Sequence, residues 1–106
     1  GAKVTLAAFS GTQVTITPDY YLPIDTYTYP ITPDVLGLDA DMDNTYEQTT
    51  PAALPVPFVH DYGGTGVFLG RVGVDILASV PPPPGANTYA AVPLGTIRCQ
   101  YVVQIV

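Results

Sequence analysis

Residues 67–80, with the sequence VFLGRVGVDILASV, decide the fold. Alternate positions of this stretch are apolar or glycine: Phe68, Gly70, Val72, Val74, Ile76, Ala78 and Val80. The intervening positions include Arg71, Asp75 and Ser79, so the opposite face meets solvent at least in part. A period of two residues is typical of a β-strand with one buried face. The stretch therefore predicts a long strand with one side in the core.

The same alternation recurs towards both ends of the chain. Residues 95–106 form a second strong strand pattern, with Cys99 in its apolar phase, where we expect a buried thiol. Residues 3–9 and 13–17 predict two strands joined by a hairpin turn at residues 10–12. A shorter strand is predicted at residues 88–92. Most of the apolar sequence thus reads as antiparallel strand.

Twelve prolines interrupt the remaining sequence. Because proline cannot donate a ladder hydrogen bond, we expect residues 18–51 to be an irregular acidic loop, with one helical turn near residues 34–38. Edge strands are predicted at residues 26–29 and 54–58, where proline would block pairing on the exposed side. Residues 81–85, PPPPG, predict a stiff polyproline excursion that ends in a turn.

These patterns define the fold class. At 106 residues and 47% hydrophobic content, the chain is expected to be one folded β domain over residues 1–106. Strands without helical connections pair antiparallel, so we expect an all-β antiparallel sandwich or jelly-roll-like barrel of about six to eight short strands with long Pro/Tyr-rich loops.

The charge is low and unevenly placed. Three cations face nine acids, for a net charge of −6, and seven of the acids precede position 48. They are Asp19, Asp25, Asp34, Asp39, Asp41, Asp43 and Glu47. Nucleic acid and anionic membrane surfaces both require clustered Lys and Arg, so we expect no nucleic-acid partner. No apolar run reaches the roughly 18 residues of a membrane span, so we expect no membrane insertion.

Five tyrosines lie among these acids: Tyr20, Tyr21, Tyr27, Tyr29 and Tyr46. So many rings in one Pro-rich segment cannot all be core, and tyrosine supplies large contact area at little entropic cost. We expect these tyrosines to form an interface. Plain loop packing is the alternative, and stacking on a carbohydrate is a third interpretation.

Asp39, Asp41 and Asp43 form the candidate metal site. Three aspartates at alternate positions can converge their oxygens on Ca²⁺, which takes six to eight oxygen ligands. The helix-loop-helix calcium motif is excluded, because Asn44 stands at its required glycine and Thr50 at its bidentate glutamate. A generic Ca²⁺ site and a solvated acidic turn both remain open.

The only place where an imidazole meets a carboxylate in the sequence is the adjacent pair His60 and Asp61, which is a candidate for catalysis. A nucleophilic triad would also need a suitably placed Ser, Thr or Cys, and Cys99 belongs to the core phase of another strand. We therefore expect no enzymatic activity and no catalytic residues.

Two motifs carry a resemblance to a known class of protein. Residues 95–103 follow the pattern G-T-I-x-x-x-Y-x-V and look like the closing strand of β-sandwich domains in small RNA-virus coat proteins. The aspartate loop at residues 39–43 resembles the calcium-binding aspartates of nodavirus-like and tombusvirus-like coats. The resemblance implies a protruding spike domain of an icosahedral capsid. Phage head-decoration proteins are similar in composition.

What the resemblance implies is a non-enzymatic structural role. The chain would be a protruding or decoration module on the virion surface. It would form a homodimer or contact capsid neighbours, and it would meet a host receptor or glycan. The alternative is an extracellular carbohydrate-binding or adhesin β-sandwich module. The two differ in whether the module self-associates or binds glycan as a monomer.

Overall fold

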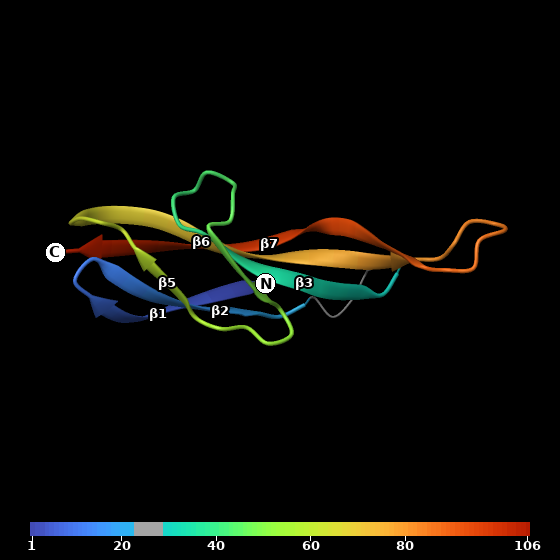
Figure 1. Ribbon diagram of the computed structural model, residues 1–106, viewed down its shortest axis with the longest axis horizontal. Coiled ribbons are helices and arrows are strands. Elements are labelled where there is room, and N and C mark those ends of the chain that lie inside the picture. The colour runs from blue at the N-terminus through green and yellow to red at the C-terminus, as the bar shows by residue number, and fades with distance from the viewer. Residues whose placement is uncertain (23–28) are drawn as a thin grey trace.

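The computed structural model describes residues 1–22 and 29–106, and Figure 1 shows that this part of the chain is built from strands without helices. The strands are β1 (Ala2–Ser10), β2 (Gln13–Tyr20), β3 (Ile31–Asp39), β4 (Gln48–Pro51), β5 (Phe58–Asp61), β6 (Gly66–Val80) and β7 (Ala90–Ile105). Within these residues the chain forms no helix that is long and apolar enough to cross a bilayer.

The strands form two antiparallel sheets. The first has the order β1-β2-β5 and the second the order β4-β3-β6-β7. The predicted all-β, antiparallel fold is confirmed. The two sheets stay separate and do not close into a barrel, and the jelly-roll-like connectivity stays a prediction.

The molecule is elongated, with extents of 60 × 23 × 21 Å. Figure 1 shows why: the first sheet covers only one half of the second. We call the half where the two sheets overlap the body. The other half is the arm, residues 77–97, which comprises the end of β6, the polyproline turn and the start of β7, and Ile31 and Thr32 of β3 pair with its base.

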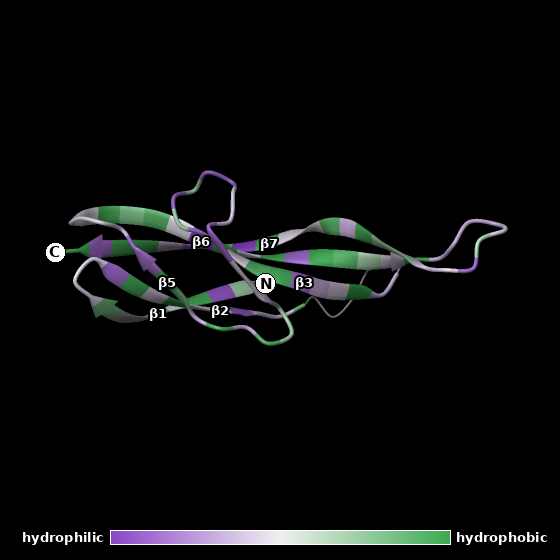
Figure 2. Cartoon of the chain, in the orientation of Figure 1, coloured by the Kyte–Doolittle hydropathy of each residue, from purple (hydrophilic) through white to green (hydrophobic). Residues whose placement is uncertain are grey.

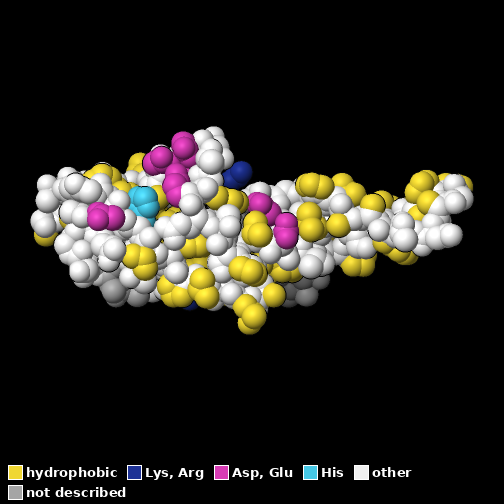
Figure 3. Space-filling view, in the orientation of Figure 1, with side chains coloured by type: hydrophobic (Ala, Val, Ile, Leu, Met, Phe, Trp, Pro, Cys, Tyr) yellow, Lys and Arg dark blue, Asp and Glu magenta, His cyan; other side chains and the backbone are white. Residues whose placement is uncertain are grey.

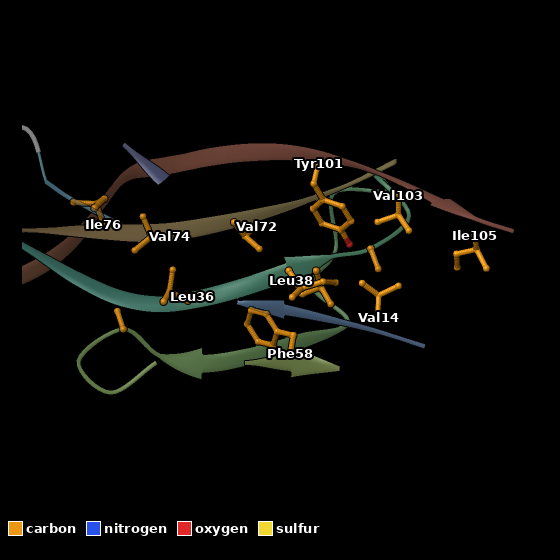
Figure 4. Close-up of a cluster of buried hydrophobic side chains, with 13 residues drawn as sticks. Val14, Leu36, Leu38, Phe58, Val72, Val74, Ile76, Tyr101, Val103 and Ile105 are labelled. Atoms are coloured by element: carbon orange, nitrogen blue, oxygen red, sulfur yellow. The ribbon is translucent and has the colours of Figure 1, made fainter. Parts of the chain in front are cut away.

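The core lies between the sheets in the body (Figure 4). It is formed by Val14, Ile16, Leu36, Leu38, Ala40, Ala52, Phe58, Val72, Val74, Ile76, Tyr101, Val103 and Ile105. On β6 and β7 these side chains come from alternate positions, as the period-two pattern predicts. Figure 2 shows the same hydrophobic stretches along β6 and β7, with the hydrophilic loop above them.

Three strand predictions are confirmed and two are merged. The hairpin of β1 and β2 turns at Gly11, whose φ of 60° suits a residue without a Cβ. β6 matches its predicted stretch to within one residue. The stretches predicted at residues 88–92 and 95–106 form one strand, β7, with a bulge at Leu94. Cys99, predicted to be buried, is half-buried on this strand.

The helical turn predicted at residues 34–38 is wrong, because this segment belongs to β3. Leu36 and Leu38 alternate into the core with 0% exposure, while Gly37 points to the outer face. Much of the predicted loop at 18–51 is therefore regular strand: the end of β2, all of β3 and β4.

The prolines are accommodated because a strand can be an edge along part of its length. Pro33 pairs with Ile76 of β6, but β4 pairs only with Val35–Leu38, so among the strands of the described residues β3 has one neighbour at Pro33. A bulge follows between Pro33 and Leu36. Pro18 likewise pairs with β1 at a point beyond the reach of β5. A proline can therefore lie in an inner strand, provided that the strand has only one paired neighbour at that residue.

The two predicted edge strands fare differently. The strand expected at residues 54–58 is displaced to β5, which is an edge of the first sheet as expected. Of the strand predicted at residues 26–29, residues 26–28 lie outside the described part, and Tyr29 sits in a bend.

Candidate functional site

The acidic loop, residues 40–47, connects β3 to β4 and is anchored by one carboxylate. Asp39, at the end of β3, is 1% exposed. Its Oδ1 accepts the amide of Asp43 at 3.0 Å, and its Oδ2 accepts the amide of Asn44 at 2.9 Å. The Nε of Arg71, on β6, lies 3.0 Å from the same Oδ2. Because β3 and β6 pair directly at Asp39 and Arg71, the sheet itself positions this ion pair.

These contacts set the ionisation of Asp39. Burial by itself raises the pKa of a carboxyl group, but the amide of Asn44 and the guanidinium of Arg71 outweigh it and lower the pKa of Asp39. Arg71 also donates to the side-chain oxygen of Asn44. Asn44 has a φ of 69°, a left-handed conformation that asparagine tolerates. Asp39 therefore holds the loop as a charged, fully hydrogen-bonded anchor.

Four carboxylates converge in this loop. Asp39, Asp41, Asp43 and Glu47 can each place one oxygen within 4.8 Å of the others. The structure thus brings the three predicted residues together and adds Glu47, which sequence reasoning missed. Because Leu38 pairs with Gln48, the chain returns beside Asp39 and places Glu47 next to the three aspartates. Recognising a β3–β4 hairpin in the sequence would have revealed it.

The exposed members of the cluster repel one another. The neighbouring carboxyl group of Glu47 raises the pKa of Asp41. The amide of Thr45 acts to lower the pKa of Asp43, but burial and Asp41 outweigh it, so the pKa of Asp43 is raised. Such oxygens are the ligand type that Ca²⁺ prefers, yet both oxygens of Asp39 already accept hydrogen bonds. The calcium site stays a prediction.

Tyr46 fixes the loop to the outer face of the second sheet. Its ring lies over Gly37 of β3 and Gly73 of β6, which pair across the sheet and leave a trough that any Cβ would fill. Its hydroxyl donates to Asp75 at 2.9 Å. Burial, followed by the hydrogen bond to Asp75, raises the pKa of Tyr46 to about 12. Tyr46 is therefore held within the monomer.

The other predicted interface tyrosines differ in exposure. Tyr20 is half-buried and donates to the carbonyl oxygen of Ala52 at 3.1 Å. Tyr21 is 69% exposed and Tyr29 is 41% exposed. Tyr27 lies outside the described residues. Of the four rings that the structure describes, two are available at the surface and two are engaged in packing.

His60 and Asp61, the predicted catalytic candidates, have separate surroundings. The rings of His60 and Tyr62 pack in a T-shaped arrangement, with centroids 4.5 Å apart. Asp61 accepts the Thr12 hydroxyl and the amide of Gly63, and these hydrogen bonds lower its pKa. The absence of catalytic activity stays a prediction.

A groove lies between the acidic loop, β5 and the start of β6, and sequence reasoning missed it. Its volume is about 520 Å³. Asp41 and Glu47 line one side of it, His60 and Asp61 the other, and apolar residues of β6 complete the lining. In Figure 3 the single histidine lies between two groups of acidic side chains on this part of the surface. No sequence signal could have found the groove, because three separate segments form it.

Comparison with known proteins found no relative of this chain. No family model matches the chain, and neither a curated protein nor a solved structure gives a significant match.

Proposed function

We propose that this chain is a non-enzymatic structural module that associates with a second copy of itself through its arm. One observation carries the proposal: no charged residue occurs between Asp75 and Arg98, so the whole arm is uncharged. Monomeric proteins usually interrupt long strand edges with charged side chains, which oppose association. The arm has no such charge, and β7 is an edge strand of the second sheet.

The surface of the arm supports this role. Along β7 the residues from Ala90 to Gly95 are exposed in both phases, so no residue that the structure describes covers either face of this segment. Val92 is 41% exposed and Leu94 is 46% exposed. At the bulge, a hollow of about 290 Å³ lies between Leu94, Ile76 and Ile97. An exposed apolar surface with a hollow is typical of protein–protein contact.

The charge distribution favours a second copy as the partner. Each chain carries a net charge of −6, so two bodies repel one another. The acidic side chains seen in Figure 3 lie on the body and at its boundary with the arm, whereas the far end of the arm shows none. Two copies can therefore pair arm to arm and keep their carboxylates apart.

The surface of a virus particle is the proposed setting. Its support is the resemblance of residues 95–103 and 39–43 to small RNA-virus coat proteins, with which an open antiparallel two-sheet fold is compatible. In that setting the chain would be a jelly-roll-like protruding or decoration module in dimeric form, and exposed Tyr21 and Tyr29 would contact the host surface. A basic segment followed by a longer β domain, encoded directly upstream of Gly1, would support this setting.

An extracellular carbohydrate-binding module is the second candidate, favoured by the 69% exposure of Tyr21. Sugars stack on exposed aromatic rings, and Tyr20 and Tyr46 are engaged within the monomer. Glycan-array binding by a solution monomer, lost in Tyr21→Ala, would favour this candidate over the structural module.

Sedimentation velocity over a range of concentrations tests self-association. We expect a monomer–dimer equilibrium in which Leu94→Lys shifts the protein to monomer, because two buried ammonium groups would face each other. Leu54→Lys is the matched control, since Leu54 is 79% exposed but belongs to the body. A wild type that stays monomeric at all concentrations, or equal effects of the two variants, would refute the proposal.

A further inference from the structure

We propose that the groove between the acidic loop, β5 and β6 binds a lysine or arginine side chain, flanked by apolar residues, from a partner protein of another kind. The groove lies on the body, away from the arm. This inference therefore goes beyond the proposed function and does not depend on it. Three features of the groove carry it: its charge, its aromatic wall and its apolar lining.

The charge of the groove selects a cation. Asp41, Glu47 and Asp61 contribute carboxylates to its lining, and no lysine or arginine is among the described residues that line it. One carboxylate oxygen of Asp41 and one of Glu47 lie within 4.8 Å of each other, so these two groups repel each other when both are ionised. A cation in the groove would relieve that repulsion.

The aromatic wall is fixed before any partner arrives. Tyr62 stacks on Phe68 with centroids 4.6 Å apart and an interplanar angle of 25°, and the His60 ring packs against Tyr62 in a T-shaped arrangement. The Tyr62 hydroxyl lies 2.6 Å from that of Tyr101 and donates to the carbonyl oxygen of Ala40 at 3.2 Å. These bonds tie the wall to β7 and to the acidic loop. Aromatic rings next to carboxylates favour organic cations.

The apolar lining indicates that the groove binds a side chain and not a metal ion alone. Val67 is 65% exposed and Leu69 is 53% exposed, and both line the groove. A metal ion would contact the carboxylates and leave these residues in water. A lysine or arginine side chain places its charged end among the acids and its aliphatic stem along the apolar residues. The volume of about 520 Å³ also leaves room for flanking residues of the partner.

A second copy of this chain is a poor source of that cation. The chain holds three cations in all, and Arg71 is paired with Asp39. Only Lys3 and Arg98 remain. A partner with its own basic, apolar segment matches the groove in both charge and hydrophobicity.

The test titrates the isotope-labelled protein with a capped tripeptide, arginine between two valines, and follows the amide signals by NMR. We expect saturable shifts at residues 40–47 and 60–69. Glu47→Gln keeps an acceptor for the Ala40 amide but removes one charge, so its affinity should fall about two- to fivefold. Leu69→Ser should also weaken binding. Asp34→Asn, an exposed acid on β3 outside the groove, is the matched control and should leave affinity unchanged.

Several outcomes would overturn the proposal. An absence of shifts up to roughly 10 mM peptide would exclude a usable site. Equal shifts with norleucine in place of arginine would show that the charge is irrelevant. Equal shifts with calcium alone, unaffected by Leu69→Ser, would assign the groove to a metal ion. Loss of wild-type self-association in Glu47→Gln would assign it to a second copy.

Discussion

At the scale of single residues, the side chain of Tyr46 attaches the acidic loop to the outer face of the second sheet. Its ring fits because Gly37 and Gly73, paired on adjacent strands, present no side chains to it. The sequence showed a tyrosine in an acidic, Pro-rich segment and suggested exposure. It could not show the trough, because the trough exists only after β3 and β6 pair. The hydroxyl group of Tyr46 then finds its acceptor, Asp75, on β6.

Gly37→Ala tests this fit. The added methyl would overlap the Tyr46 ring, so we expect destabilisation of roughly 1–3 kcal/mol in urea unfolding, as for other overpacked sites. Gly64→Ala is the control, since Gly64 lies outside the arm and no described atom lies within 4 Å of its added Cβ. Equal stability of the two variants would mean that Tyr46 does not occupy the trough.

At the scale of elements, β3 is the strand that the sequence did not predict. β6, the C-terminal part of β7 and the β1–β2 hairpin were predictable because apolar residues alternate along them. In β3 the prolines concealed the pattern, although Leu36 and Leu38 carry it. Because β3 was not predicted, Glu47 was also missed as a member of the acidic cluster, since its position follows from the pairing of β3 with β4.

The acidic loop that follows β3 makes a pH-dependent prediction. Because the folded-state pKa of Asp41 is raised, its repulsion is absent below the unfolded pKa of about 4 and develops as pH rises through the folded value. Asp41→Asn should therefore raise Tm at pH 7 by on the order of 1–2 °C at low salt, and not at pH 3. Thermal unfolding at the two pH values checks this. A lower Tm at pH 7 would contradict it.

The calcium hypothesis is tested by the same thermal unfolding experiment with calcium added. Calcium would remove the repulsion by coordination, so it should raise Tm more in the wild type than in Asp41→Asn. An excess of chelator should reverse the rise. Identical melting curves with calcium and with chelator would dismiss the metal site.

At the scale of the whole molecule, the offset between the sheets matters most. Composition and periodicity predicted two apolar faces, but they carry no information about how far one sheet extends past the other. That offset produces the arm and the 60 Å length. It also separates the uncharged arm from the acidic body, which makes contact between copies compatible with a net charge of −6.

Small-angle X-ray scattering over a concentration series tests the arm-to-arm contact most directly. We predict that the maximum dimension grows well beyond the 60 Å monomer axis as the dimer forms, because the bodies point away from each other. Leu94→Lys should hold it at the monomer value. A dimer that gains mass but keeps a maximum dimension near that axis would place the contact along the bodies and contradict the account.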